Sequence, residues 1–467
     1  MKSGSFIPRF LIKKDARSVE HFPMGKWINR ARVTTSDTIK GHGPIVRIAP
    51  NEYSIDDPAA VKHIYGSGKG FTKASSPWYQ ASGNPYSTTT NIFCESNPHL
   101  HAAARRKIAS AYSMTSLVQV EPFVDDCTAL LIQKMNEFAS SGASVDIAHW
   151  MQCFAFDVGE RFGFLDSGQD VQGVMASLSD YLDYCARVGI FSEWHKTLYH
   201  RLRQSKKLSG ILNVRNFAVT QLQAKFGKLE SDEEKADPKT PADFITKFLR
   251  IHNQEPGKIT KDDISTVCVM NVGAGSDTTS IAFTAALFYL VKYPTALSRL
   301  RDEIRDFEAQ GLISNPISFS EAQKMPYTQA VIKEALRMHP ATGLILGRVV
   351  PPAGATLAGQ YFPSGTVVGI NSWVAHANQD VFGPDVDVFR PEIWLEEEVV
   401  VKRRDAYFMV SKLTITASQF GQGSRTCIGR NISIMELSKV LPQIIRHFDF
   451  VPDTESGMAE CKTENVC

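Results

Sequence analysis

A ten-residue segment near the end of the chain, Phe420 to Gly429, limits the possible folds more than any other feature. It reads FGQGSRTCIG, with glycines on both sides of its only cysteine, Cys427. Gly421 and Gly429 allow turns and a close backbone approach that a side chain would block. Apolar residues at helical spacing follow and predict a helix from Ile428 to about Phe448. The positive end of that helix would lie beside the sulfur and stabilise its thiolate.

A thiolate in such a loop is a suitable ligand for iron. Thiolate ligation pushes electron density onto bound oxygen and favours O–O cleavage. Arg425, two residues before Cys427, can offer a fixed guanidinium to a carboxylate. The competing interpretation is a glycine-rich turn around a cysteine that serves as a small buried hydrophobe.

Composition excludes several other classes of protein. The 467 residues are 43% hydrophobic and 21% charged, which indicates an ordinary folded chain. The 51 basic and 49 acidic residues give a net charge of +2, so nothing indicates a nucleic-acid partner. The eight cysteines form no CxxC pair, which leaves a zinc ribbon or thioredoxin-like site without support.

The periodic segments predict a mainly α fold with a small segregated β-sheet, the α+β class. Helices are expected after Pro98, from Glu121 to Phe138, from about Thr260 to Lys292, after the capping-box sequence Ser318–Glu321, and from Pro326 to His339. Strands are expected at Ile45–Pro50, at Tyr53–Ile55 and between Gly343 and Gly369. The first forty residues and the charged run Ser231–Pro238 show no period.

A second unusual segment, Ala274 to Thr279, lies inside the longest predicted helix. Gly273 and Gly275 each cost a helix about 1 kcal/mol, and hydroxyl groups compete there for backbone carbonyls. We therefore expect a widened turn in which water or a ligand can sit. Asp277 and Thr278 could relay protons at such a turn. The alternative is a helix-packing site built from small residues.

Taken together, these segments resemble the cytochrome P450 family of haem-thiolate monooxygenases. The family's haem-loop pattern, Phe-x-x-Gly-x-Arg-x-Cys-x-Gly, matches here at every fixed position. The resemblance extends from about Gly43 to Phe448. Four short segments look like filamentous-fungal members near the pisatin demethylase group: Val46–Pro50, Asn91–Phe93, Ala111–Met114 and Trp373–His376. The resemblance implies the cytochrome P450 fold, with haem b between the long central helix and the helix that follows the cysteine loop.

The resemblance also implies a role for individual residues. Cys427 would ligate the iron, and Asp277 with Thr278 would deliver protons in the oxygen-activation groove. The cofactor-binding positions would be Cys427, Arg425, His101, Arg105, Arg348, Phe420, Gly421, Gly429 and Ala274. Ala341, Thr342, Gly343 and Leu344 would line the substrate pocket. Glu334 and Arg337 match the family's structural E-x-x-R pair.

The sequence departs from the family pattern at several points. The Arg that normally completes the E-x-x-R core is replaced by Ile393, and Arg390 nearby would not point the same way. This predicts a buried ion pair with no third partner. The stretch Phe156–Gly163 looks several residues short. We expect residues 1–40 to be an atypical segment without a membrane anchor, 41–450 to form the haem domain, and 451–467 to be a polar tail in place of the usual terminal strands.

The expected function is a monooxygenase that inserts one oxygen atom from O2 into a small apolar metabolite, by hydroxylation, O-demethylation or epoxidation. The resemblance implies fungal secondary metabolism or detoxification, electrons from NADPH through NADPH–cytochrome P450 reductase, and a place at the endoplasmic reticulum membrane surface. It allows membrane contact, although the sequence shows no signal peptide or transmembrane segment. The alternatives are a degenerate inactive member and a haem protein without turnover. Asp277 and Thr278 count against an electron carrier, which needs no proton delivery.

Overall fold

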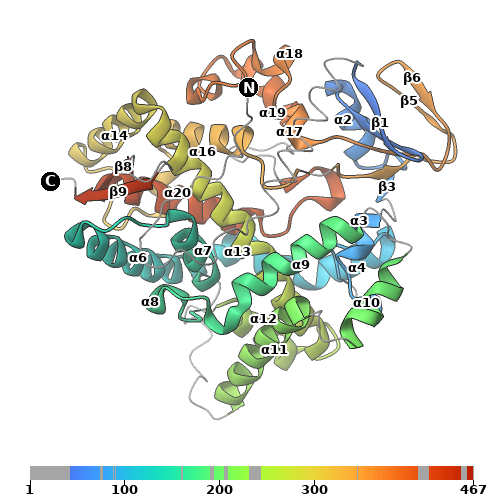
Figure 1. Ribbon diagram of the computed structural model, residues 1–467, viewed down its shortest axis with the longest axis horizontal. Coiled ribbons are helices and arrows are strands. Elements are labelled where there is room, and N and C mark those ends of the chain that lie inside the picture. Colours follow the sequence, from blue (N-terminus) through green and yellow to red (C-terminus); the bar gives the residue numbers. More distant parts are fainter. Residues whose placement is uncertain are drawn as a thin grey trace.

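Helices make up most of this protein, and a small sheet lies at one end of it (Figure 1). The computed structural model describes residues 43–73, 77–87, 89, 91–158, 161–189, 194–204, 209–230, 243–343, 345–408, 420–453 and 460–465. The predicted fold class, mainly α with a small segregated sheet, is confirmed.

The helices follow the predicted order closely. The first group is α2 (Pro58–Tyr65), α3 (Pro77–Ala81), α4 (Pro98–Ile108), α5 (Met114–Leu117), α6 (Glu121–Ser141), α7 (Ile147–Asp157), α8 (Phe164–Ser167), α9 (Val174–Val188), α10 (His195–Gln204) and α11 (Ser209–Glu230). The second group is α12 (Phe244–Gln254), α13 (Lys261–Lys292), α14 (Pro294–Ala309), α15 (Phe319–Ala322), α16 (Pro326–Met338), α17 (Ser372–Ala375), α18 (Gln379–Phe382), α19 (Glu398–Tyr407) and α20 (Arg430–His447). Capping boxes at Thr260 and Ser318 start α13 and α15, because each side chain accepts a hydrogen bond from an otherwise free N–H group.

The main sheet brings distant parts of the chain together. Its strand order is β1 (Ile45–Ala49), β2 (Glu52–Ile55), β7 (Val367–Gly369), β4 (Arg348–Val349) and β3 (Thr72–Lys73). Strands β3 and β4 are antiparallel, with Lys73 opposite Arg348, so two cations lie on one rung. A separate hairpin joins β5 (Ala355–Leu357) to β6 (Gln360–Phe362).

The end of the chain differs from the expected tail. Strand β8 (Phe448–Asp453) pairs with β9 (Glu460–Asn465) in antiparallel register, with Phe448 opposite Asn465. The expectation that strands are missing beyond Phe450 is therefore wrong. Strand β9 packs against α6, and Figure 1 shows both at the edge of the molecule opposite the main sheet. The domain limits at residues 40 and 450 stay predictions.

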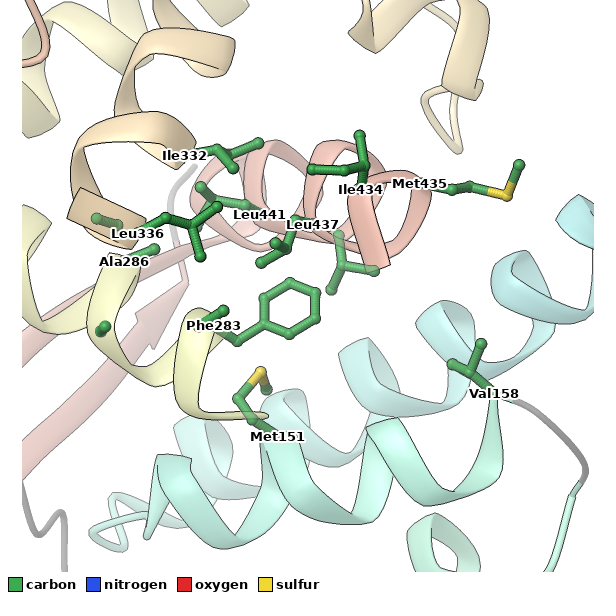
Figure 2. Close-up of a cluster of buried hydrophobic side chains, with 14 of the residues drawn as sticks. Met151, Val158, Phe283, Ala286, Ile332, Leu336, Ile434, Met435, Leu437 and Leu441 are labelled. Atoms are coloured by element: carbon green, nitrogen blue, oxygen red, sulfur yellow. The ribbon is translucent and has the colours of Figure 1, made fainter. Parts of the chain in front are cut away.

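Helix α13 runs through the centre and packs against α7, α16 and α20. Figure 2 shows the apolar contacts at this crossing, where Phe283 of α13 lies among Met151, Leu336 and Leu437. Phe283 and Met151 are fully buried, and each such side chain stabilises the fold by roughly 1.5–3 kcal/mol. This core fixes α13 relative to α20, and thus the two segments that the sequence marked as functional.

Within the described residues, no single helix has both the length and the apolar character needed to span a membrane. Helices α13 and α14 meet those criteria only as a pair, and they are bent by 107° where they join.

Candidate functional site

A cavity of about 1230 Å³ lies between α13 and the cysteine loop. Ordinary ligand pockets measure about 300–1,000 Å³, so this one has room for a macrocycle and a second small molecule. Its wall includes these residues that the sequence marked: His101, Arg105, Ala274, Asp277, Thr278, Ala341, Thr342, Gly343, Arg348, Phe420, Gly421, Arg425, Cys427 and Gly429. Leu344 lies outside the described residues. The chain therefore brings residues from five separated segments to one cavity.

The cysteine loop is held by its own backbone and by α2. The Cys427 N–H donates to the Phe420 carbonyl at 2.6 Å. Gly421 and Gly423 have φ angles of 73° and 68°, in the left-handed region that favours glycine. A Cβ on Gly423 would also collide with the carbonyl oxygen of Tyr65, the last residue of α2. Glycine at 423 thus lets the loop lie directly on α2.

The Cys427 side chain faces the cavity. Helix α20 begins at Arg430, two residues after its predicted start, and the backbone N–H groups of Gly429 and Arg430 at this end point to the sulfur. Burial raises the pKa of the Cys427 thiol, while the N–H groups of Gly429 and Arg430 and the Arg105 guanidinium act to lower it. These donors are the kind that stabilise a thiolate ligand.

Cationic groups converge on the wall beside the loop. Arg105 donates to the Thr426 carbonyl at 2.7 Å, and Arg425 donates to the Glu95 carbonyl at 2.6 Å. Among the described residues, neither these two arginines nor Arg348 forms an ion pair with a carboxylate. Buried cations normally have an anionic partner. Their arrangement therefore fits the two carboxylates of a haem.

His101 and Lys73 belong to the same wall. Burial, reinforced by the nearby arginines, lowers the pKa of His101 to about 4, so it is neutral at physiological pH. Burial and Arg348 lower the pKa of Lys73 to about 7. The Lys73 ammonium donates to the Phe93 carbonyl and lies 3.6 Å from the ring centroid of Tyr79. Sequence reasoning missed Lys73, because a lysine in a two-residue strand carries no distinctive pattern.

The α13 segment presents an acid and a hydroxyl to the cavity. Asp277 is 7% exposed, and burial raises the pKa of its carboxyl to about 6. The Thr278 hydroxyl donates to the Ala274 carbonyl at 2.8 Å. The predicted widened turn is wrong for this structure, because α13 is a continuous α-helix from Lys261 to Lys292. Gly275 instead provides the open space, since a Cβ there would meet no atom within 4 Å.

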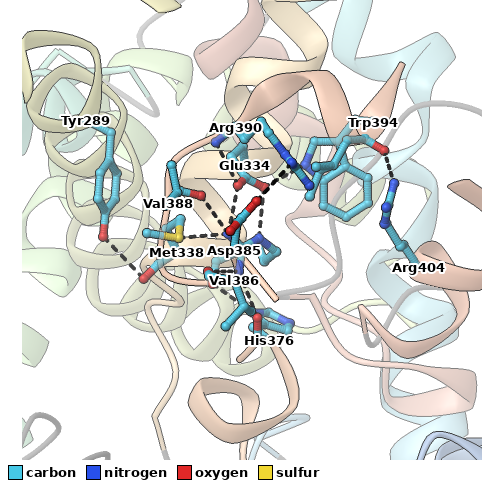
Figure 3. Close-up of polar contacts among 12 residues, drawn as sticks. Tyr289, Glu334, Met338, His376, Asp385, Val386, Val388, Arg390, Trp394 and Arg404 are labelled. Atoms are coloured by element: carbon cyan, nitrogen blue, oxygen red, sulfur yellow. Dashed lines mark hydrogen bonds and ion pairs between the residues drawn. The ribbon is translucent and has the colours of Figure 1, made fainter. Parts of the chain in front are cut away.

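The Glu334–Arg337 pair lies in a buried core, apart from the cavity wall (Figure 3). Glu334 is 0% exposed, and its two oxygens accept from Arg337 Nε at 2.9 Å and Nη2 at 2.7 Å. Arg337 also donates to the carbonyls of His376 and Val386. This bidentate arrangement joins α16 to the segments on either side of α18.

The prediction that this pair lacks a third partner is wrong. The Trp394 indole N–H donates to Glu334 Oε2 at 2.9 Å, and the Arg390 backbone N–H donates to Oε1 at 3.1 Å. Figure 3 shows Trp394 and Arg390 converging on the carboxylate. The Arg390 side chain points away, toward Asp385, as expected. Ile393, at 2% exposure, packs into apolar core instead.

Comparisons with known proteins agree with this geometry. The family model described as Cytochrome P450 matches residues 27–466. Two pisatin demethylases of Fusarium vanettenii are each 36% identical to this chain, covering 88% of it and 77% and 79% of their own lengths. A cytochrome P450 monooxygenase of Aspergillus terreus is 32% identical over 91% of this chain and 88% of its own length.

Proposed function

Because the chain belongs to the cytochrome P450 family and is a haem-dependent monooxygenase, we propose that it inserts one atom of O2 into a small apolar metabolite. The supporting observation is one cavity whose wall contains Cys427, the carboxyl of Asp277 and three arginines that form no ion pair with a carboxylate of the described residues. An electron carrier would need the cysteine and the cations but not the acid. A bound haem would supply the activation of O2.

The residues of the chain then divide into three groups by contact. Cys427 holds the iron, with Phe420, Gly421 and Gly429 shaping the loop around it. Arg105, Arg348, Arg425 and His101 hold the haem carboxylates, the arginines by charge and the neutral His101 by hydrogen bonding. Asp277 holds a proton at its carboxyl, and the neighbouring Thr278 hydroxyl orients its transfer. Ala274 lies beside them, where a side chain larger than its methyl group would narrow the cavity.

The substrate occupies the part of the cavity beyond the macrocycle. One side of this part consists of Ala341, Thr342 and Gly343. The other side consists of largely apolar residues of α9 and α13, among them Val269 and Met270. Such a wall selects an apolar molecule by burial. Since two relatives are named pisatin demethylases, a methoxylated aromatic compound is the first substrate to test, with O-demethylation as the reaction.

Electrons come from NADPH through NADPH–cytochrome P450 reductase, at the surface of the endoplasmic reticulum membrane. The family supports a redox partner in general terms, and the fungal relatives support a role in secondary metabolism or detoxification.

The test is a reconstituted reaction under ¹⁸O2 with reductase, NADPH and a panel of methoxylated aromatics. One labelled oxygen atom is expected in the product, or in the formaldehyde released by demethylation. Cys427→Ser is the matched inactive control. A protein that takes up haem but oxidises no compound, with no substrate-dependent NADPH consumption, would instead favour the degenerate or non-catalytic alternative.

A further inference from the structure

A buried tyrosine and an asparagine form a polar pair in an apolar stretch of α13. Tyr112, at the end of the 3-10 helix Ala109–Tyr112, donates its hydroxyl hydrogen to Asn271 Oδ1 of α13 at 2.6 Å. Both residues line the cavity. Tyr112 is 5% exposed, and its ring centroid lies 5.1 Å from that of Phe244 and 6.2 Å from that of Phe248. The pair thus brings a side-chain amide to a part of the wall that is otherwise mostly apolar.

The tyrosine fixes which end of the amide faces the cavity. Burial raises the pKa of Tyr112, so its hydroxyl keeps its hydrogen and needs an acceptor for it. Asn271 Oδ1 is the only acceptor that the described residues offer to this hydroxyl. If the amide were turned over, the hydroxyl hydrogen would be buried without an acceptor, which is costly. The amide nitrogen, Nδ2, is therefore held on the side away from Tyr112.

The Nδ2 group of Asn271 is available to a ligand. Within the part of the chain that the structure describes, no group accepts a hydrogen bond from it. Helix α13 packs against α7, α16 and α20, so the partly exposed side of Asn271 is the side that borders the cavity. A hydrogen bond is stronger in such surroundings than in water, because the local dielectric constant is low. Nδ2 is thus a donor that faces any molecule bound in the cavity.

Sequence reasoning missed Asn271, although a signal was present. It is the only side chain with an amide or hydroxyl group between Thr266 and Ser276. Asparagine is a weaker helix former than most residues, and an amide is costly to bury without a hydrogen-bond partner. An amide inside such an apolar run therefore indicates a specific contact.

The position of Asn271 sets a minimum size for the ligand. Asn271, Ala274 and Thr278 are spaced by three and four residues, so they lie along one face of α13. A rise of 1.5 Å per residue places Asn271 about 10 Å from Thr278 along the helix axis. A molecule that is oxidised beside Thr278 and also reaches Asn271 must extend over most of this length. A fused two-ring aromatic compound with one substituent does so.

We propose that Asn271 Nδ2 donates a hydrogen bond to an acceptor oxygen of the substrate, and that Tyr112 orients the amide for this contact. The inference rests on the proposed function, because it narrows the substrate class of the same cavity to aromatic compounds of at least two rings that carry a ketone, lactone or ether oxygen. Asn271 touches the substrate, whereas Tyr112 is a positioning residue. A hydrocarbon of the same shape leaves the donor unpaired and binds more weakly.

The test compares Kd values for matched probes that differ only in the acceptor. The pairs are 2-acetyl-6-methoxynaphthalene with 2-isopropenyl-6-methoxynaphthalene, and 2-methoxynaphthalene with 2-ethylnaphthalene. Calorimetric titration of the haem-loaded protein gives each Kd without turnover. For at least one pair, we expect the preference for the oxygen-containing member to be about threefold to tenfold greater in the wild type than in Asn271→Leu, the range for one net hydrogen bond. Comparing the two proteins cancels the difference in hydration between the probes.

The role of the tyrosine is tested with Tyr112→Phe, which keeps the amide but no longer fixes its orientation. Part of the preference should be lost. The matched control is Tyr181→Phe, because Tyr181 also lines the cavity but donates to the Ser82 carbonyl at 2.7 Å. It should keep the wild-type preference. A purely structural role for Tyr112 would lower stability without changing the preference between the probes.

The results distinguish this inference from the proposed function. If both pairs show the same preference in Asn271→Leu as in the wild type, the inference is overturned, even if the wild type oxidises the probes. If Asn271→Leu does not fold, the double variant Tyr112→Phe with Asn271→Leu replaces it, since that variant leaves neither polar group unpaired. A wild type that binds neither pair overturns the substrate class. A wild type that shows the preference but oxidises no compound supports the donor and contradicts the proposed function.

Discussion

Replacing Ile393 by arginine is expected to destabilise this protein, although arginine is the residue that the family pattern places there. The Glu334 carboxylate already accepts hydrogen bonds from Arg337 on both oxygens. It accepts two more, from the Trp394 indole and the Arg390 backbone N–H. A new guanidinium at 393 would therefore enter an apolar site in which its expected partner is fully occupied.

The magnitude follows from burial. Ile393 is 2% exposed, and burying such a side chain contributes roughly 1.5–3 kcal/mol. An arginine stem keeps part of that apolar contact. A buried charge without a partner typically costs about 3–5 kcal/mol. We therefore expect the free energy of unfolding to fall by about 3–5 kcal/mol in Ile393→Arg, against less than about 1.5 kcal/mol for the volume-conserving control Ile393→Leu.

The assay is urea unfolding, followed by circular dichroism and by haem absorbance. Trp394→Phe removes one hydrogen bond to a charged group. It should lower the free energy of unfolding by about 1.5–3 kcal/mol more than its matched control Trp150→Phe does. The Trp150 indole packs edge-on against Phe138, and its nitrogen has no hydrogen-bond partner among the described residues. Combining Ile393→Arg with Trp394→Phe should cost less than the sum, since Glu334 Oε2 then accepts only from Arg337 Nε and can accept from the new guanidinium as well. An Ile393→Arg protein as stable as the wild type, or more stable, would refute this reasoning.

Three further predictions concern the cavity. In Thr278→Ala, NADPH should still be consumed, but the electrons should go to peroxide or water instead of product. An unchanged ratio of product to NADPH would show that Thr278 has no role in proton delivery. Gly423→Ala should lose haem more readily than Gly421→Ala, because only at 423 does the added methyl group meet the Tyr65 carbonyl; equal haem retention would contradict this. Asp277, whose pKa is raised to about 6 from 3.8, binds more protons when folded, so its contribution to stability is lost as pH rises through 6. Between pH 4 and pH 7.5, the free energy of unfolding of Asp277→Asn, measured in urea, should therefore rise by up to roughly 3 kcal/mol relative to that of the wild type. If the free energies of the two proteins change in parallel with pH, the pKa of Asp277 is not raised.

Local patterns predicted much of this fold because they act over a few residues. Thr260 and Ser318 each cap a helix within three residues, so both helix starts were visible in the sequence. The pattern around Cys427 predicted a turn that needs glycine, and the observed φ angles agree. The predicted residues from distant segments also reach one cavity, which only the family resemblance could indicate.

Long-range contacts account for what the sequence did not reveal. The third donor to Glu334 comes from Trp394, sixty positions away, and an indole N–H leaves no local pattern. Lys73 lies opposite Arg348 because of the register of two very short strands, β3 and β4, and that register cannot be seen in the sequence. The polar composition of β9 indicated a tail without regular structure. The segment forms a strand because it pairs with β8.

The visible spectrum of the reduced protein with carbon monoxide tests the central claim most directly. If Cys427 is the thiolate ligand of a haem, the wild type shows the red-shifted band of this protein family, and Cys427→Ser or Cys427→Ala lacks it. Variants of the other cysteines, such as Cys153→Ser in the buried core, should keep the band. A normal band in Cys427→Ala, or no red-shifted band in a folded, haem-loaded wild type, would contradict the assignment.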